Sequence, residues 1–382
     1  MTQDKTNKVS NVPPLRFPEF SGEWEKFALS DFTERVTRRN KGNACRLPLT
    51  ISAQYGLVDQ ITFFNKQIAS ADMSNYYLMK KGEFTYNKSY SGDYPWGAVK
   101  RLDRYDEGCL SSLYICFSLK PFVNSDFITH YFETTKWYRG VSEIAGEGAR
   151  NHGLLNIAIP DYFATKHYLP ANSEEQQKNA DLFNLLTKRI ETQIRVIDKL
   201  ESLIKGIRAT VFNNVQPNTK LGEIADIYQP QTIASTDCNR GQYLVFGANG
   251  VIGRYEQYNH EQPQICITCR GNTCGTVNFS EPFSWITGNA MVINIDNNKE
   301  VNKRYLFHYL STQNFHHIIS GSGQPQIVRS PLLKFPIYLP SMQTQVKLAE
   351  MLDLLRCRLK TEQDILEKYQ QQKAYLLQNM FI

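Results

Sequence analysis

Two long segments of the chain carry apolar residues at a spacing of about 3.5 positions, which predicts two long helices. The first segment runs from Glu174 to Phe212 and contains no proline and one glycine. Its apolar positions are Phe183, Leu186, Ile190, Ile197, Leu200, Ile204, Ile207 and Val211. In the second segment, near the C-terminus, they are Leu352, Leu355, Leu359, Leu366, Tyr369, Leu376 and Met380. Such a narrow stripe is typical of a coiled coil rather than of a helix lying on a broad core.

The two helical segments are copies of one another. Residues 176–212 align without gaps on residues 345–381 at an offset of 169, and nine of the 37 positions are identical. Further upstream, residues 27–32 resemble residues 219–224 at an offset of 192. The repeat predicts a globular domain followed by a long helix, and then a second domain followed by a second helix.

Polar residues interrupt the apolar stripe at matching places. Gln193 is matched by Glu362, and Ile204 is matched by Lys373. Two interpretations stay open: a stripe that partly faces solvent, or two helices that pack on each other with a polar layer fixing their register. We favour mutual packing, with each helix about 55 Å long at 1.5 Å per residue. The predicted helix–helix interface comprises Leu186, Ile190, Gln193, Ile197, Leu200, Leu355, Leu359, Glu362, Leu366 and Tyr369.

The globular segments mix short β-type runs with turns rich in Gly, Asn and Pro, which predicts an α+β fold for each. Strands are expected at 110–117, 243–246, 264–268 and 290–295, and helices at 126–137 and 302–315. The turn at 247–250 is expected to join two strands rather than to open a phosphate-binding helix. The expected division is a polar tail 1–14, a first domain 15–167, a first helix 168–214, a second domain 215–338 and a second helix 339–382.

The composition excludes several classes of protein but does not indicate a function. The chain has 382 residues, of which 41% are apolar and 21% charged, so disordered, collagen-like and disulfide-scaffold classes are excluded. The net charge of +6 suits an anionic partner such as nucleic acid without proving one. The N-terminus lacks the apolar core of a signal peptide, and no apolar run is long enough to span a membrane. We therefore expect a cytoplasmic protein with no membrane contact.

Candidate chemistry is sparse. Cys266, Cys269 and Cys274 are spaced like metal ligands, but in a β-type run Cys266 and Cys269 point to opposite faces, which favours buried reduced thiols. There is no Gly-Lys pair for a P-loop, and no Asp or Glu after Asp161 is followed at the second position by Lys, as a metal-dependent nuclease would require. The chain also lacks the Asn/Asp-Pro-Pro-Phe/Tyr motif of amino-methyltransferases. We expect no catalytic residue and no metal site.

Several stretches, together with the repeat, resemble the DNA specificity subunits of type I restriction–modification enzymes. Residues 12–24 resemble the opening of that family. Residues 243–253, 265–275 and 284–287 resemble a common target-recognition module. Residues 339–350 resemble the start of the family's spacer helix, whereas the first copy departs from it by one additional residue before the helix.

The resemblance implies a non-catalytic reader of DNA. Each globular segment would be a target-recognition domain for one half of a bipartite, asymmetric double-stranded DNA sequence. The two helices would pair as an antiparallel coiled coil, set the gap between the halves and dock two modification (methyltransferase) subunits and, through these, the restriction subunits. The chain itself would hold no cofactor, because S-adenosylmethionine, ATP and Mg²⁺ belong to the partner subunits.

Candidate DNA contacts follow from base chemistry, since Arg pairs with guanine and Asn or Gln with adenine. In the first domain the candidates are Lys88, Tyr90, Lys100, Arg101, Arg104 and Arg139. In the second domain they are Asn249, Arg254, Arg270, Asn272 and Gln324. For the lysines, phosphate contact is favoured over base contact. Three alternatives remain: a nuclease or methyltransferase with an unrecognised site, a coiled-coil scaffold that binds only protein, and the recognition half of a fused restriction enzyme.

Overall fold

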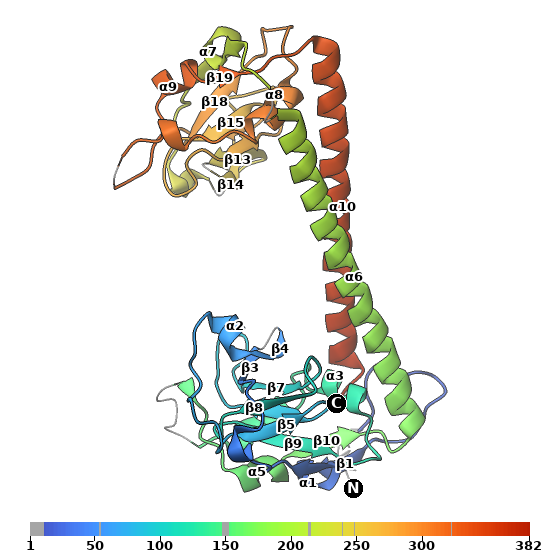
Figure 1. The fold of residues 1–382 in the computed structure, drawn as a ribbon. Coiled ribbons are helices and arrows are strands. Elements are labelled where there is room, and N and C mark those ends of the chain that lie inside the picture. The colour runs from blue at the N-terminus through green and yellow to red at the C-terminus, as the bar shows by residue number, and fades with distance from the viewer. Residues whose placement is uncertain are drawn as a thin grey trace, which may run out of the picture. The chain divides into compact units, whose positions relative to one another are not determined.

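The computed structural model describes residues 11–52, 55–146, 153–212, 215–238, 240–247, 249–321 and 323–382. Residues 1–10 of the predicted polar tail lie outside the described residues. The chain forms two compact units: one extends to Thr192 and also includes Leu366–Ile382, and the other comprises Gln193–Ile365. Each unit therefore contains one globular domain and parts of both long helices (Figure 1).

The globular part of the first unit is α+β, as predicted. Its main sheet is four-stranded and antiparallel, in the order β2-β9-β6-β7. These strands are β2 (Thr33–Arg35), β9 (Ile115–Leu119), β6 (Phe84–Asn87) and β7 (Ala98–Arg101). Three further antiparallel pairs are β1 (Glu25–Ala28) with β10 (Lys166–Leu169), β3 (Leu49–Ser52) with β4 (Gly56–Asp59), and β5 (Tyr77–Lys80) with β8 (Glu107–Leu110). The short helices are α1 (Leu29–Phe32), α2 (Gln60–Phe64), α3 (Ser125–Tyr131), α4 (Tyr138–Ile144) and α5 (Ile159–Ala164).

The globular part of the second unit is also built from small sheets and short helices. A four-stranded antiparallel sheet has the order β12-β18-β15-β16, and a three-stranded sheet has the order β14-β13-β17. Their strands are β12 (Asp226–Tyr228), β18 (Ala290–Asn294), β15 (Ile265–Thr268), β16 (Val277–Phe279), β14 (Gly250–Tyr255), β13 (Tyr243–Gly247) and β17 (Trp285–Ile286). A short pair joins β11 (Thr219–Lys220) to β19 (Pro336–Ile337), and the helices are α7 (Leu221–Ile224), α8 (Lys303–Leu310) and α9 (Arg329–Leu333).

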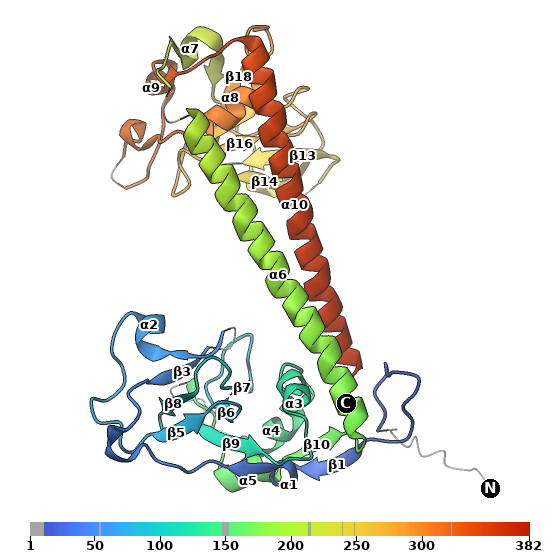
Figure 2. The same cartoon turned by 45° about the vertical axis from the view of Figure 1, so that its right-hand side comes forward.

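The two long helices are α6 (Ser173–Phe212) and α10 (Met342–Asn379), close to the limits that the apolar stripe predicts. The segments of α6 and α10 that belong to one unit lie side by side in both views (Figure 2). They are antiparallel. In the first unit Lys373 donates to Thr187 and Arg189 stacks on Tyr369, so residue numbers increase along α6 in the direction in which they decrease along α10.

Three predictions on the globular segments need correction. The helix expected at 302–315 ends at Leu310, because the N–H groups of Thr312 and Gln313 close turns on the Tyr309 and Leu310 carbonyls. The strand expected at 110–117 is divided into β8 and β9, because Tyr114 N–H closes a turn on the Ser111 carbonyl. The helix expected at 126–137 ends at Tyr131, and a separate helix, α4, follows. The strand–turn–strand expected around 247–250 is confirmed as the β13–β14 hairpin.

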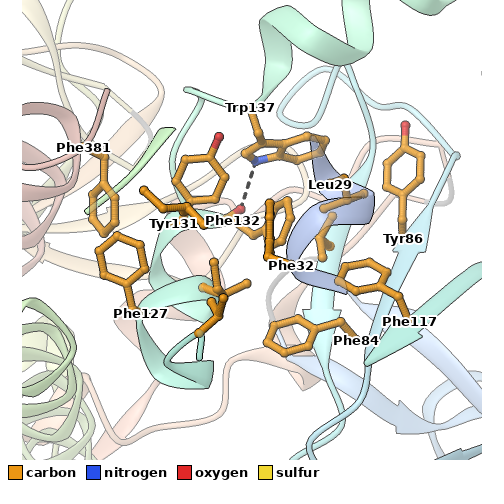
Figure 3. Close-up of a cluster of buried hydrophobic side chains, with 14 of the residues drawn as sticks. Leu29, Phe32, Phe84, Tyr86, Phe117, Phe127, Tyr131, Phe132, Trp137 and Phe381 are labelled. Carbon is orange, nitrogen blue, oxygen red and sulfur yellow. Dashed lines mark hydrogen bonds between the residues drawn. The ribbon is translucent and has the colours of Figure 1, made fainter. Parts of the chain in front are cut away.

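A ring near the end of each long helix completes the core of one unit. Phe381 is fully buried and faces Phe127 (Figure 3), with 5.2 Å between the two ring centroids. Its centroid lies 6.3 Å from that of Trp24. Its counterpart in the repeat, Phe212, lies edge-on to Tyr309 at 5.5 Å in the core of the second unit. Each domain therefore packs on the helix that follows it and also on the end of the other helix.

A glutamine near the start of each helix makes the same contacts in both units. Gln176 accepts a hydrogen bond from Asn124 N–H (2.8 Å) and donates to the Pro170 carbonyl (2.9 Å). Gln345 accepts from Asn302 N–H (2.8 Å) and donates to the Pro340 carbonyl (2.9 Å). Asn124 and Asn302 in turn cap α3 and α8. The repeat thus extends from the helices into domains whose sequences show little likeness.

We predict that Phe381→Ala lowers the free energy of unfolding by about 3–5 kcal/mol, because it leaves a cavity among packed aromatic rings. Tyr375→Ala removes an aromatic ring from the last turns of α10 at a position that is 61% exposed, and should change the free energy of unfolding by less than about 1 kcal/mol. Urea denaturation of both variants measures the difference. Equal losses in the two variants would contradict the role of the Phe381 ring.

Candidate nucleic-acid interface

Arg101, a predicted DNA contact at the end of β7, is engaged within the first unit. Its guanidinium pairs with Asp103 (2.6 Å) and Asp126 (2.7 Å) and donates to Ser125 Oγ. Only 17% of the side chain is exposed. The structure therefore places Arg101 as a brace between β7 and the first turn of α3.

Lys100, the preceding residue of β7, lies near two charged groups: Glu133, which follows α3, and Lys373 of α10. Its burial, with a contribution from the ammonium of Lys373, lowers the pKa of Lys100, while Glu133 opposes that shift. Burial also resists ionisation of Glu133, but its hydrogen bond to His130 and the charge of Lys373 outweigh this and lower its pKa to about 2. Both lysines are thus held next to an ionised carboxylate.

The other four candidates of the first domain are dispersed. Lys88 is half-buried and its carbonyl accepts from Leu155 N–H, while Tyr90 packs against the core. Arg139 on α4 is 89% exposed and pairs with Glu143 one turn away. Arg104 is exposed on the loop between β7 and β8. Of these four candidates, Arg104 and Arg139 are exposed, whereas Lys88 and Tyr90 are half-buried.

Three candidates of the second domain are brought together by two adjoining loops. Gly271 N–H donates to the Pro325 carbonyl, and Arg270 forms a β-bridge with Gln326. Arg270, Asn272 and Gln324 are exposed on these loops. They combine a guanidinium with two side-chain amides, the groups that pair with guanine and adenine edges.

The remaining two candidates lie on the β13–β14 hairpin. Asn249 is exposed at its turn, and Arg254 is exposed on β14, where its Nη1 donates to the Gln242 carbonyl (2.7 Å). Gly253 allows the hairpin to pack closely, since a Cβ there would lie 2.0 Å from the Cys238 carbonyl oxygen. Val251 and Ile252 are each 53% exposed on the same strand. The hairpin is a fixed two-stranded ribbon, a shape that the major groove admits.

The predicted helix–helix residues all lie on the inward stripe of α6 and α10. Leu186, Ile197 and Glu362 are buried. The half-buried members are Ile190, Gln193, Leu200, Leu355, Leu359, Leu366 and Tyr369. Gln193 Nε2 donates to the backbone carbonyl of Glu362 (2.9 Å) and also to its carboxylate, which pairs with Arg358. These contacts form a polar layer between two apolar stretches.

A second repeated contact between domain and helix is not among the predicted residues. His130 Nε2 lies 2.9 Å from Asn184 Oδ1 in the first unit, and His308 Nε2 lies 2.8 Å from Asp353 Oδ1 in the second. Burial outweighs the neighbouring carboxylate and lowers the pKa of His308 to about 4, so this ring is neutral at pH 7. Asn184 and Asp353 are equivalent under the 169-residue offset, which was the available signal.

The cysteines are divided between separate hydrophobic clusters. Cys266 and Cys269 belong to different ones, as alternation along a strand predicts, and burial raises the pKa of Cys266 to about 12. Among the described residues, no group of three or more His, Cys, Asp or Glu side chains is placed to hold a metal ion.

Part of the chain is similar to a known family of domains. Residues 215–371 match the type I restriction modification DNA specificity domain. The chain is 28% identical over 111 residues to the specificity subunit of the type I restriction enzyme EcoprrI of Escherichia coli, covering 29% of this chain and 27% of that protein. A putative type I restriction enzyme specificity subunit of Haemophilus influenzae is 29% identical over 119 residues, covering 30% of each protein. The matches thus span less than a third of these relatives.

Solved structures share the fold over nearly the whole chain. The S subunit of a type I restriction-modification system from M. genitalium superposes with a TM-score of 0.66 at 17% identity, covering 97% of this chain and 99% of that one. A chain from a structure described as the basis of complex assembly and conformational transition of the type I R-M system gives 0.55 at 15% identity, covering 94% and 97%. Among the described residues, no helix is both long and apolar enough to cross a membrane.

Two substitutions in α6 test whether its apolar stripe is a packed interface. Ile197→Asp places a charge at a position that is 8% exposed and should lower the free energy of unfolding by about 3 kcal/mol or more. Ile194→Asp introduces the same charge one turn earlier, where the side chain is 41% exposed, and should cost less than about 1 kcal/mol. Urea denaturation compares the two. If the variants are equally stable, the stripe is not a packed interface.

Proposed function

We propose that the chain is the non-catalytic DNA-recognition subunit of a type I restriction–modification complex, because residues 215–371 match the specificity domain of that family and the fold matches a solved S subunit. Each globular domain reads one half of a bipartite DNA target. The two long helices set the gap between the halves and dock two modification subunits, to which the restriction subunits attach. S-adenosylmethionine, ATP and Mg²⁺ are used by those partners, and the complex acts in the cytoplasm.

The repeated contact between domain and helix is the observation that supports this proposal most directly. The Gln176 and Gln345 networks have the same partners and the same distances, and the Phe212 and Phe381 rings fill equivalent positions. Two bodies mounted in the same way on one helix pair suit a target made of two separate halves. Their exposed loops differ, which suits halves of different sequence.

The two domains should read DNA independently. Replacing residues 15–167 with the corresponding domain of another family member should change one half-site and leave the other unchanged, because the second unit has its own core. The replacement must keep a pocket for the Phe381 ring. Mapping methylated sequences in cells that express the variant with its modification subunit measures the outcome. A change in both half-sites would contradict independent reading, and methylation by the isolated chain would contradict a non-catalytic role.

The helix pair should act as a ruler only when both helices are lengthened together. The Gln193–Glu362 contact shows that an insertion into one helix alone would shift its residues against the other. Four residues inserted after Ile194 and four after Lys360 add about one turn, roughly 6 Å, which corresponds to just under two base pairs at about 3.4 Å each. We expect the same half-sites with a gap longer by one or two base pairs in the methylation map. The matched control with only the α6 insertion should fail to assemble, and an active double variant with an unchanged gap would exclude the ruler.

A further inference from the structure

The most cationic stretch of the chain is a segment that none of the predicted contacts includes. Residues 35–46 contain five Lys or Arg and no Asp or Glu. Arg38 alone of the five is in an ion pair within the described part of the chain, with both carboxylate oxygens of Glu83 at 2.8 Å. The remaining four are Arg35, Arg39, Lys41 and Arg46. The segment therefore carries a positive charge that the first unit does not neutralise.

A buried asparagine fixes the shape of this loop. Asn40 is fully buried, and its side chain accepts from Cys45 N–H (2.9 Å) and donates to the Cys45 carbonyl (2.8 Å). Gly42 and Asn43 adopt left-handed backbone conformations, with φ of 68° and 55°. Asn43 Oδ1 also accepts from Met73 N–H (2.8 Å) on the neighbouring loop. The loop is thus held closed at its base before any partner arrives.

Three cations project from this fixed loop. The Arg39 guanidinium stacks 4.4 Å from the ring centroid of Tyr77, and its Nη1 donates to the Asn75 carbonyl. Its Nε and Nη2 groups have no partner among the described residues. Lys41 and Arg46 are exposed, also without an ion pair or a hydrogen bond from the side chain to the described residues. Arg39 is therefore held in place while its Nε and Nη2 groups remain able to donate hydrogen bonds to a ligand.

We propose that this loop, through Arg39, Lys41 and Arg46, contacts the sugar–phosphate backbone of DNA and positions the first domain on the duplex. The proposal rests on the proposed function and identifies contacts within it. Guanidinium and ammonium groups bind phosphate oxygens without regard to base sequence, so the loop sets position rather than specificity. Because its backbone is already ordered, little conformational entropy is lost on binding.

The composition of the loop favours DNA over a protein partner. Protein–protein interfaces bury a centre of aromatic and aliphatic side chains. Between the exposed cations the loop offers only Gly42, Asn43 and Ala44, and its apolar residues Val36 and Cys45 are buried. A charged, polar and ordered rim with no apolar centre suits a phosphate backbone.

The experiment measures binding of the full-length chain to a fluorescent 30-base-pair duplex as a function of salt. Each phosphate contact contributes about 0.9 to the slope of log K against log salt concentration. The triple variant Arg39→Ala, Lys41→Ala, Arg46→Ala should reduce the slope by about two to three and weaken binding at low salt by tenfold or more. The control variant Lys299→Ala, Lys334→Ala, Lys347→Ala removes three exposed cations of the second unit and should change the slope by less than one.

The possible outcomes distinguish failure of the loop proposal from failure of the proposed DNA-binding function. If the wild-type chain shows no salt-dependent binding, the proposed DNA-binding function fails and the loop proposal fails with it. If the wild type binds and the loop variant keeps its full slope, or if both triple variants lose the same slope, only the loop proposal is overturned. Loss of assembly with the modification subunit at unchanged DNA affinity would assign the loop to a protein contact instead. Circular dichroism and the single variant Lys41→Ala, with an expected slope change of about one, exclude misfolding as the cause.

Discussion

Burial of one aromatic ring near the end of each long helix is the constraint on which both compact units depend. Phe381 fills the space between Trp24 and Phe127, and Phe212 fills the equivalent space against Tyr305 and Tyr309. Because α6 begins in one unit and ends in the other, and α10 runs the opposite way, neither domain has a complete core without both helices. Helix length and domain folding are therefore coupled. If a helix is lengthened or rotated, its terminal ring must still lie in the core of the domain that it completes.

The middle of the helix pair serves a different purpose from its ends. Gln193 and Glu362 hold a buried polar layer, with Arg358 supplying a counter-charge for the carboxylate. A buried polar layer adds little stability compared with apolar residues, but it penalises any other register, since a shift would leave the carboxylate buried without its partners. The rings fix where each helix ends, and the layer fixes how the helices align. A pair of helices that is to hold a fixed spacing needs both.

The sequence predicted the helices and the repeat well, because a 3.5-residue stripe and a gap-free match are local signals that persist over 37 positions. The candidate DNA contacts stay predictions, because residue type alone does not say which charged groups are paired within the fold. Arg101 is an example: its guanidinium pairs with Asp103 and Asp126, and Asp126 belongs to α3, 25 residues further along the chain. Conversely, the unpaired charge of residues 35–46 was visible as a run without acids, but the fixed shape of its loop depends on Asn40 and Met73, which the sequence does not bring together.

Within the repeat, the contacts that join domain to helix are alike, whereas the exposed charges differ. Residues that join domain to helix keep their chemistry: Gln176 and Gln345, His130 and His308, Phe212 and Phe381. The basic stretch 35–46 falls, at the 192-residue offset, on residues 227–238, which contain no cation and one acid. Two domains that are mounted identically thus present different charges after equivalent strands, β2 and β12. The contacts that join each domain to its helices are therefore separate from the exposed charges that differ between the domains, so one set of residues can change without disturbing the other.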